Sequence, residues 1–377
     1  MSLKNAGDQA IRAERRSIGV IRTHRASMKS ENTRSTSVGD MPTERVQVLR
    51  VTRSDNPSLS RRTMLKTAFA GAAGLAGAAA LATSAPGVAR AVPRGGYEEI
   101  WVPSEMGPIK CQVQWAKRGG SASLYLLDGM RARPDANAWS FETNAFEQFA
   151  LDDVTLVMPV GGESSWYSDW YNASNFNQQG VTYKWETFLT RHLPAALAAR
   201  GVDRTRTGIA GLSMGGTAAL NLAAHHRDQF KFAASFSGYL WLNAPGMRSA
   251  IRIAMLDAGL YNVDAMYGPP WDESWARNDP FTQAENLRGL PMYVSAGSGI
   301  PGYANRVENM VDVVNTANGM GLEALSLATT RAFQARLDSL GIGATYNFPN
   351  VGTHSWPYWS EELWRARPHI LSALRAG

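Results

Sequence analysis

The stretch TGIAGLSMGGTAALNLAAHH, residues 207–226, carries the strongest structural signal in the chain. Its first six residues form a short apolar run that ends in Gly211-Leu212-Ser213-Met214-Gly215, and a helical pattern follows at once. A G-x-S-x-G motif between a strand and a helix is typical of a tight turn that lifts the serine hydroxyl to the carboxyl edge of a sheet. The five letters alone are a weak signal. Their position between strand and helix predicts that Ser213 is a nucleophile rather than an ordinary turn serine.

Apolar runs bounded by turn residues predict further strands, and helical periods lie between the later ones. The predicted strands are residues 97–103, 109–116, 122–127, 154–160, 232–237, 291–296 and 344–348, in addition to 207–212. The predicted helices are residues 183–199, 214–226, 247–258, 323–338 and 359–374. Adjacent early strands followed by strand–helix alternation favour the α/β class, with a mostly parallel central sheet that starts antiparallel and is flanked by helices.

Two histidines near the C-terminus are candidates for the base that a serine nucleophile needs. With this motif the chain order is serine, acid, histidine, which favours His354 and His369. His369 falls inside an amphipathic helix, where a packing or surface role is expected. His354 stands in a turn-rich loop, residues 350–356, between the last strand and the last helix, from which it can reach the sheet edge. The pattern leaves four acids open, namely Glu308, Asp312, Glu323 and Asp338.

Composition excludes several classes of function. The 377 residues carry a net charge of +6, but residues 1–91 hold 15 Lys/Arg and 6 Asp/Glu, while residues 92–377 hold 23 and 26. The second part is therefore slightly acidic, which argues against a nucleic-acid partner. The single cysteine, Cys111, cannot form an internal disulfide and is interpreted as a small buried apolar residue. The sequence has neither metal-ligand spacing nor a phosphate-binding glycine loop, so no metal and no cofactor is expected.

Residues 1–91 are interpreted as a leader with a twin-arginine-type signal peptide. Arg61-Arg62 precedes an Ala/Gly-rich stretch from Ala68 to Ala82, and Ala89-Arg90-Ala91 has the pattern of a cleavage site. The alternative is an uncleaved anchor, but the stretch lacks the ~20 strongly apolar residues of a spanning helix. We therefore predict export, cleavage near Ala91, and a domain of residues 92–377 without a stable membrane span.

Several segments together resemble one family, the mycolyltransferases, which comprise the antigen 85 proteins of mycobacteria and their corynebacterial relatives. These segments are LYLLDGMRAR (124–133), VMPVGGESSWYSDWY (157–171), YKWETFLTRHLP (183–194), GLSMGG (211–216), RNDP (277–280) and YNFPNVGTHSWPYW (346–359). The resemblance implies an α/β-hydrolase fold without a large lid. It also implies a secreted enzyme that moves a long fatty acyl chain between trehalose-linked lipids and cell-wall acceptors.

Residue by residue, the resemblance implies a complete acyl-transfer site. Ser213 matches the family nucleophile, His354 its histidine, and Glu323 falls where the family has its acid. The backbone N–H groups of Met130 and Met214 match the oxyanion hole, where such donors each contribute about 3 kcal/mol in the transition state.

The resemblance also implies a sugar site. Asp128 and Arg131 match positions that bind trehalose hydroxyls, and Trp356 matches an aromatic residue beside the sugar. The family's sugar-contacting asparagine is replaced here by Glu142. The stretch that binds matrix protein in the family is not recognisable around residues 146–151, so fibronectin binding is not carried over.

The predicted function is transfer of a mycoloyl group from trehalose monomycolate to a sugar hydroxyl through an acyl-serine. The acceptor is a trehalose glycolipid or the cell-wall arabinogalactan. Two alternatives remain open. The first is a secreted carboxylesterase that passes the acyl group to water, and the second is a non-catalytic protein that binds the cell envelope or host matrix.

Overall fold

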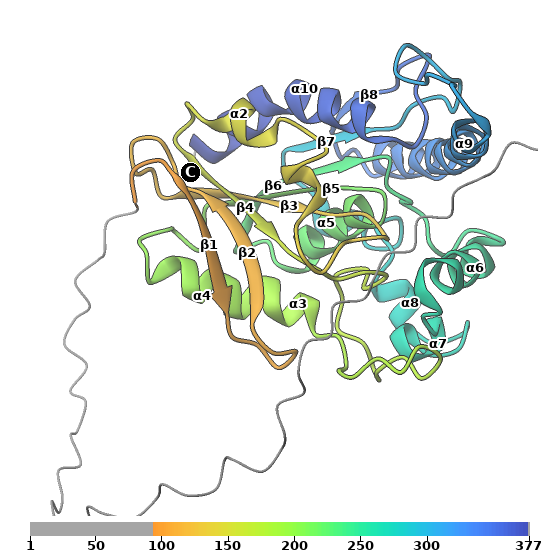
Figure 1. Ribbon diagram of the computed structural model, residues 1–377, viewed down its shortest axis with the longest axis horizontal. Coiled ribbons are helices and arrows are strands. Elements are labelled where there is room, and N and C mark those ends of the chain that lie inside the picture. Colours follow the sequence, from red (N-terminus) through yellow and green to blue (C-terminus); the bar gives the residue numbers. More distant parts are fainter. Residues whose placement is uncertain (1–92, 376–377) are drawn as a thin grey trace, which may run out of the picture. The chain divides into compact units, whose positions relative to one another are not determined.

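The computed structural model describes residues 93–375, which form an eight-stranded sheet covered by helices on both faces (Figure 1). The strand order is β1-β2-β4-β3-β5-β6-β7-β8. The strands are β1 (Tyr97–Val102), β2 (Ile109–Gln114), β3 (Ala122–Leu127), β4 (Val154–Pro159), β5 (Thr207–Leu212), β6 (Phe230–Phe236), β7 (Met292–Ser295) and β8 (Thr345–Asn347). Strand β2 runs antiparallel to β1 and β4, and all other pairs are parallel. The predicted α/β class, with its antiparallel start, is confirmed.

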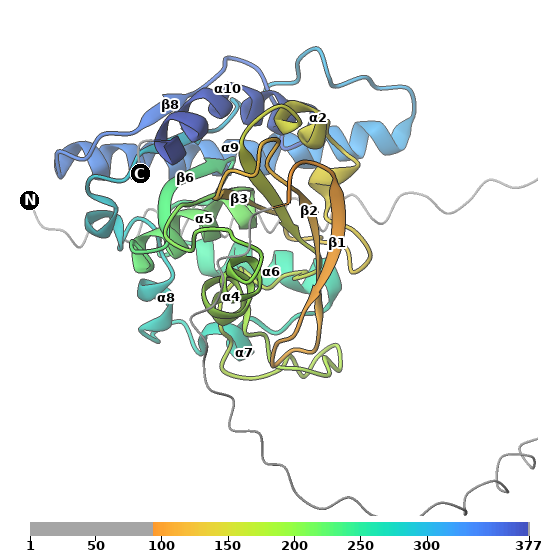
Figure 2. The same cartoon turned by 90° about the vertical axis from the view of Figure 1, so that its left-hand side faces the viewer.

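Both faces of the sheet are apolar because consecutive strand residues point to opposite sides. On β3, Tyr125 and Leu127 join one buried cluster, whereas Leu124 and Leu126 join the other. Figure 1 shows α2 and α10 on one side of the sheet and α3 and α4 on the other, and Figure 2 shows α2 and α10 above the strands and α4 below them. The helical elements are η1 (Ala138–Ser140), α2 (Ala145–Phe149), α3 (Trp185–Thr187), η2 (Phe188–His192), α4 (Leu193–Ala198), α5 (Met214–His225), α6 (Met247–Gly259), α7 (Val263–Tyr267), α8 (Ser274–Arg277), η3 (Ala284–Leu287), α9 (Met310–Ser339) and α10 (Trp356–Arg375). Between β6 and β7 the chain forms short helices rather than a large lid.

Helix α9 begins much earlier than the sequence predicts, at Met310 rather than at residue 323. A capping box starts it, because the Asn309 side chain accepts from the backbone of Asp312 and the Asp312 side chain accepts from the backbone of Asn309. Its first turns expose apolar side chains such as Met310 and Val311. Periodicity detects a buried stripe, so this exposed part of the helix escaped prediction.

The predicted leader, residues 1–91 with its paired arginines and cleavage site, lies outside the described residues and stays a prediction. Within residues 93–375, none of the helices combines the length and the apolar composition that a membrane crossing requires. All predicted site residues, from Asp128 to Trp356, lie within these residues.

The turn between β5 and α5 has the backbone that the motif predicts. Ser213 has φ 52° and ψ −122°, a conformation that costs an ordinary residue energy, and its N–H donates to the carbonyl of Phe236 at 2.8 Å. A Cβ on Gly211 would lie 2.4 Å from the carbonyl oxygen of Gly215. A Cβ on Gly215 would lie 2.4 Å from the carbonyl oxygen of Asp128. The glycines are therefore needed for close approach of backbone to backbone.

We predict that Gly215→Ala destabilises the fold by about 3 kcal/mol, because backbone rather than a flexible side chain occupies the space of the added methyl group. Gly321→Ala is the matched control, since Gly321 lies within α9 and has no atom within 4 Å of an added Cβ. It should stabilise the chain by up to about 1 kcal/mol. Urea unfolding followed by circular dichroism measures both. Equal midpoints for Gly215→Ala and the native chain would contradict the packing argument.

Candidate active site

A cavity of about 470 Å³ opens at the carboxyl ends of the parallel strands. The loop after β3, the turn at Ser213, helices α6 and α9, and the segment from His354 to Trp359 form its walls. Ser213 is buried, with 8% of its surface exposed, and faces this cavity together with His354. Ligand sites in open parallel sheets lie at this edge, which makes the cavity the candidate active site.

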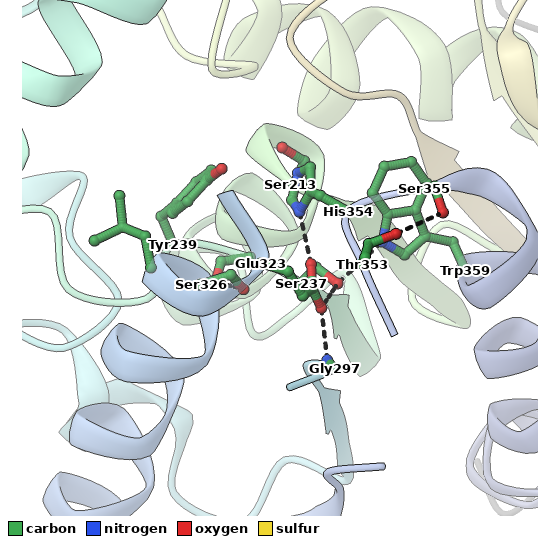
Figure 3. Close-up of polar contacts among 12 residues, drawn as sticks. Ser213, Ser237, Tyr239, Gly297, Glu323, Ser326, Thr353, His354, Ser355 and Trp359 are labelled. Atoms are coloured by element: carbon green, nitrogen blue, oxygen red, sulfur yellow. Dashed lines mark hydrogen bonds and ion pairs between the residues drawn. The ribbon is translucent and has the colours of Figure 1, made fainter. Parts of the chain in front are cut away.

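His354 and Glu323 form a buried pair. His354 Nδ1 lies 2.7 Å from Glu323 Oε2, and the carboxylate is only 1% exposed (Figure 3). The other carboxylate oxygen accepts from the hydroxyl of Ser237 at 2.7 Å and from the N–H of Gly297 at 2.5 Å. A buried carboxylate needs such partners to offset the cost of leaving water. With both oxygens satisfied, Glu323 fixes the orientation and tautomer of the imidazole.

This geometry distinguishes among the four acids that the sequence left open. Glu323 alone of them contacts His354. Asp312 is used in the capping box of α9, and the side chains of Glu308 and Asp338 are exposed. Glu323, the predicted acid, is therefore carried by a long helix between β7 and β8, and His354 by the loop after β8.

Ser213 and His354 line the same cavity, and Figure 3 shows the His354 ring between the Ser213 side chain and the Glu323 carboxylate. In the described part of the chain, the hydrogen bonds of the His354 ring include Glu323 but not the Ser213 hydroxyl. Serine–histidine hydrogen bonds are often long in the absence of substrate and tighten only in the complex. Burial raises the pKa of the neighbouring Tyr239 hydroxyl, and its contact with Ser213 lowers it in part.

Three residues that sequence reasoning missed complete this cluster. The Trp359 indole N–H donates to Ser237 Oγ at 3.0 Å, and its ring meets the His354 ring edge to face at 4.9 Å. Tyr239 lies on the other side, with ring centroids 5.9 Å apart. Ser237 has a positive φ of 52° directly after β6. A small residue after a parallel strand was the available signal for Ser237, whereas nothing in the sequence pairs Trp359 with it.

The two backbone donors predicted for an oxyanion hole lie beside the serine. Met214 is the first residue of α5, so its N–H has no partner within the helix. The Met130 N–H has no acceptor among the residues that the structure describes. The loop carrying it passes close to the turn, because a Cβ on Gly129 would lie 2.8 Å from a methyl group of Leu212. Two amides close to the serine, both without an intrachain acceptor in the described residues, are suited to stabilise an anion there.

Asp128 stands at the end of β3 as a buried carboxylate, 3% exposed. It accepts from the N–H of Gly129 at 3.0 Å and from that of Ala138 at 2.8 Å. Burial raises its pKa to about 6, and the nearby Glu142 carboxylate adds to this rise, while the two backbone donors oppose it. Glu142 lines the same cavity.

The other residues predicted for sugar binding also line the cavity. Arg131 pairs with Asp257 of α6 at 2.5 Å, a partner that the sequence did not indicate. Trp356 packs edge to face against Trp139 and Trp359, with centroids 5.5 and 5.2 Å apart. The cavity therefore has a rim of charged and aromatic groups near the strand ends.

The aromatic residues of segment 166–171, His369 and Cys111 mostly pack within the fold. Of the aromatic string 166–171, Trp166 lines the cavity, while Tyr167 and Trp170 are buried in the core. His369 lies on α10 with its ring against Tyr293 at 5.7 Å. Cys111 is fully buried, and burial raises the pKa of its thiol. Among residues 93–375 there is no group of three or more histidine, cysteine or acidic side chains placed to hold a metal.

Comparison with known proteins gives consistent matches. Residues 105–370 match the family model described as "Putative esterase". The chain is 43% identical over 284 residues to the diacylglycerol acyltransferase/mycolyltransferase Ag85B of Mycolicibacterium smegmatis, covering 74% of this chain and 85% of the relative. It is 38% identical over 340 residues to Ag85C of Mycobacterium avium, covering 88% and 93%. The crystal structure of MPT51 (FbpC1) of Mycobacterium tuberculosis matches with a TM-score of 0.64 at 30% identity, covering 74% of this chain and 99% of that one.

The buried Asp128 carboxylate should make the stability of the fold depend on pH, and the variant Asp128→Asn removes this contribution. Because folding raises its pKa from 3.8 to about 6, the folded chain binds this proton more tightly than the unfolded chain. The contribution of Asp128 to the free energy of unfolding therefore falls as the pH rises through this window. Relative to the Asp128→Asn variant, the free energy of unfolding of the native chain should fall by about 2.5 kcal/mol between about pH 4 and about pH 7.5. Urea denaturation at both pH values measures this difference, and parallel pH profiles would refute it.

Proposed function

Because the chain belongs to the esterase family and is a relative of the Ag85 mycolyltransferases within it, we propose that it is a serine acyltransferase that carries a mycoloyl group. The proposed donor is trehalose monomycolate, and the proposed acceptor is a sugar hydroxyl of a second trehalose glycolipid or of cell-wall arabinogalactan. The observation that carries the proposal is the buried Glu323–His354 pair facing the cavity of Ser213.

In the proposed first step, His354 Nε2 removes the proton of the Ser213 hydroxyl as its oxygen attacks the ester carbonyl of the donor. The Met130 and Met214 N–H groups stabilise the oxyanion of the tetrahedral intermediate. The carbon–oxygen bond to trehalose then breaks, and trehalose leaves with the proton from His354. Glu323 stays ionised throughout and stabilises the imidazolium.

In the proposed second step, His354 accepts the proton of an incoming sugar hydroxyl, whose oxygen attacks the acyl-serine. The same two amides stabilise the second oxyanion, and Ser213 leaves with the proton from His354. The acyl group thus passes from one sugar oxygen to another, and the enzyme returns to its starting state. The sequence of steps predicts ping-pong kinetics.

The chemistry of the cavity walls supports a substrate that is half sugar and half lipid. One wall is mostly apolar and comes from α6 and α9, with Ile251, Leu322 and Leu325. The charged residue that α6 adds to it, Asp257, pairs with Arg131. The other wall carries the charged groups Asp128 and Arg131. A fatty acyl chain fits the first wall by burial of apolar surface, and sugar hydroxyls fit the second by hydrogen bonding.

Export is part of the same proposal. Its support is the paired arginines Arg61-Arg62, the Ala/Gly-rich stretch and the cleavage pattern that ends at Ala91. A donor and acceptor in the cell envelope require an enzyme outside the cytoplasm, so the proposed location follows from the proposed substrates as well.

Incubation of the purified protein with trehalose monomycolate, followed by thin-layer chromatography, tests the function. We expect trehalose dimycolate and free trehalose, and Ser213→Ala should lower the rate by roughly 10⁴-fold or more while leaving the melting temperature unchanged. Free mycolic acid as the sole product would establish the carboxylesterase instead. A native chain that neither turns over nor reacts with a fluorophosphonate at Ser213 would establish a non-catalytic protein.

The role of the acid is tested by Glu323→Gln, which keeps the shape of the side chain but removes its charge. Without the carboxylate, the imidazolium that forms during each step loses its stabilising partner, so kcat should fall roughly 10³- to 10⁴-fold with little change in KM. Asp338→Asn is the matched control, because Asp338 is an exposed carboxylate on the same helix. Loss of activity in the control, or its retention in Glu323→Gln, would reject the assignment.

A further inference from the structure

A second hollow lies on the outer surface of the molecule, between α2 and α10. It is lined by Asn144, Glu147 and Gln148 from the α2 segment and by Trp364 from α10. Trp364 is 53% exposed, whereas most other tryptophans of the described chain are buried. An exposed aromatic face surrounded by amide and carboxylate groups suits a ligand with one apolar face and a border of hydroxyls.

The Arg367 guanidinium packs against the exposed Trp364. The Arg367 guanidinium stands 5.2 Å from the centre of the Trp364 ring. Arg367 is itself fixed by two hydrogen bonds to the buried carboxylate of Asp152, at 2.7 and 2.6 Å. Because this guanidinium is itself locked, its contact with one face of the ring leaves the other ring face in a defined orientation. Such preorganisation lowers the entropy cost of binding.

Helix α10 connects this hollow to the active-site cavity. Trp356 lines the cavity, and Ser360 and Trp364 follow at successive spacings of four residues, which places all three on one side of the helix. The distance along the helix from Trp356 to Trp364 is about 12 Å. This is longer than a single sugar ring and corresponds to several linked sugars.

The α2 segment also contributes residues to both hollows. Glu142 lines the active-site cavity, and Asn144, two residues further on, lines the second hollow. The Gln148 side chain bridges the two walls, because its amide donates to Asn144 Oδ1 at 2.7 Å and to the carbonyl of Ser360 at 3.4 Å. The Ser360 hydroxyl also donates to Asn144 Oδ1 at 3.4 Å, so these contacts join α2 and α10 between the two hollows and place polar groups midway between the two tryptophans.

We propose that the hollow at Trp364 is a distal saccharide subsite, which binds a linear oligosaccharide acceptor whose end reaches the acyl-serine. One sugar ring stacks on the free face of Trp364, and Glu147 and Asn144 accept and donate hydrogen bonds at its hydroxyls. An acyl chain would gain nothing from these polar walls, and the Glu147 carboxylate disfavours an anionic ligand. The inference rests on the proposed function for the identity of the acceptor, but its binding test needs no turnover.

Isothermal titration calorimetry of the native chain, without acyl donor, tests the subsite. The probes are a linear arabinofuranosyl hexasaccharide and methyl arabinofuranoside. We expect the hexasaccharide to bind at least about tenfold more tightly, and Trp364→Ala to raise its Kd roughly three- to tenfold. Trp364→Tyr, which keeps a stacking face, should retain most of the affinity. Trp271→Ala is the matched control, since Trp271 is 84% exposed and lines neither hollow.

Equal affinity for the two probes, or an unchanged Kd in a folded Trp364→Ala variant, would overturn the subsite. The outcome is independent of the acyl-transfer assay. A chain that binds the hexasaccharide through Trp364 but fails to transfer mycolate would retain the subsite and lose the proposed function. A chain that transfers mycolate, with Trp364→Ala leaving the KM advantage of the hexasaccharide over trehalose intact, would retain the function and lose the subsite.

Discussion

The constraint on which the rest of the site depends is the close packing of three backbone segments around Ser213. Strand β5, helix α5 and the loop after β3 approach so closely that Cβ atoms on Gly211 and Gly215 would lie 2.4 Å from carbonyl oxygens. This contact forces the serine into its positive φ and directs its hydroxyl to the cavity. It also brings the loop that carries the Met130 amide beside the N-terminus of α5. One packing requirement therefore positions both the proposed nucleophile and the two amides that we propose as its oxyanion donors.

A second requirement is that the buried charge of Glu323 be fully satisfied. Its partners come from distant parts of the chain: Ser237 after β6, Gly297 after β7 and His354 after β8. Trp359 of α10 then holds Ser237. Loss of His354 would leave Glu323 Oε2 without a partner, and loss of Ser237 or Gly297 would leave Oε1 with one donor instead of two. These four segments are therefore held together by the same polar network that orients the histidine.

The sequence predicts what periodicity and order along the chain can express. Every strand was placed to within a few residues, because each is an apolar run between turn residues, and Ser213 and His354 follow from the motif and the order of the triad. Glu323 could not be distinguished from Asp312 by pattern, since what separates them is burial beside the imidazole ring. The early start of α9 and the Arg131–Asp257 pair escaped prediction because the first depends on a cap and the second on contacts between distant segments.

Helix α10 shows how one element can serve both stability and recognition. Its inward face, with Leu363, Ile370 and Leu374, packs on the sheet, and this burial fixes the direction of the helix axis. With the axis fixed, the residues at spacings of four on its flank are presented along one side of the helix, starting at the cavity that Trp356 lines. A flexible loop could not hold Trp356 and Trp364 in register over this distance. A rigid helix that begins beside the proposed nucleophile is therefore a suitable support for the proposed acceptor chain, which must deliver one hydroxyl to a single point.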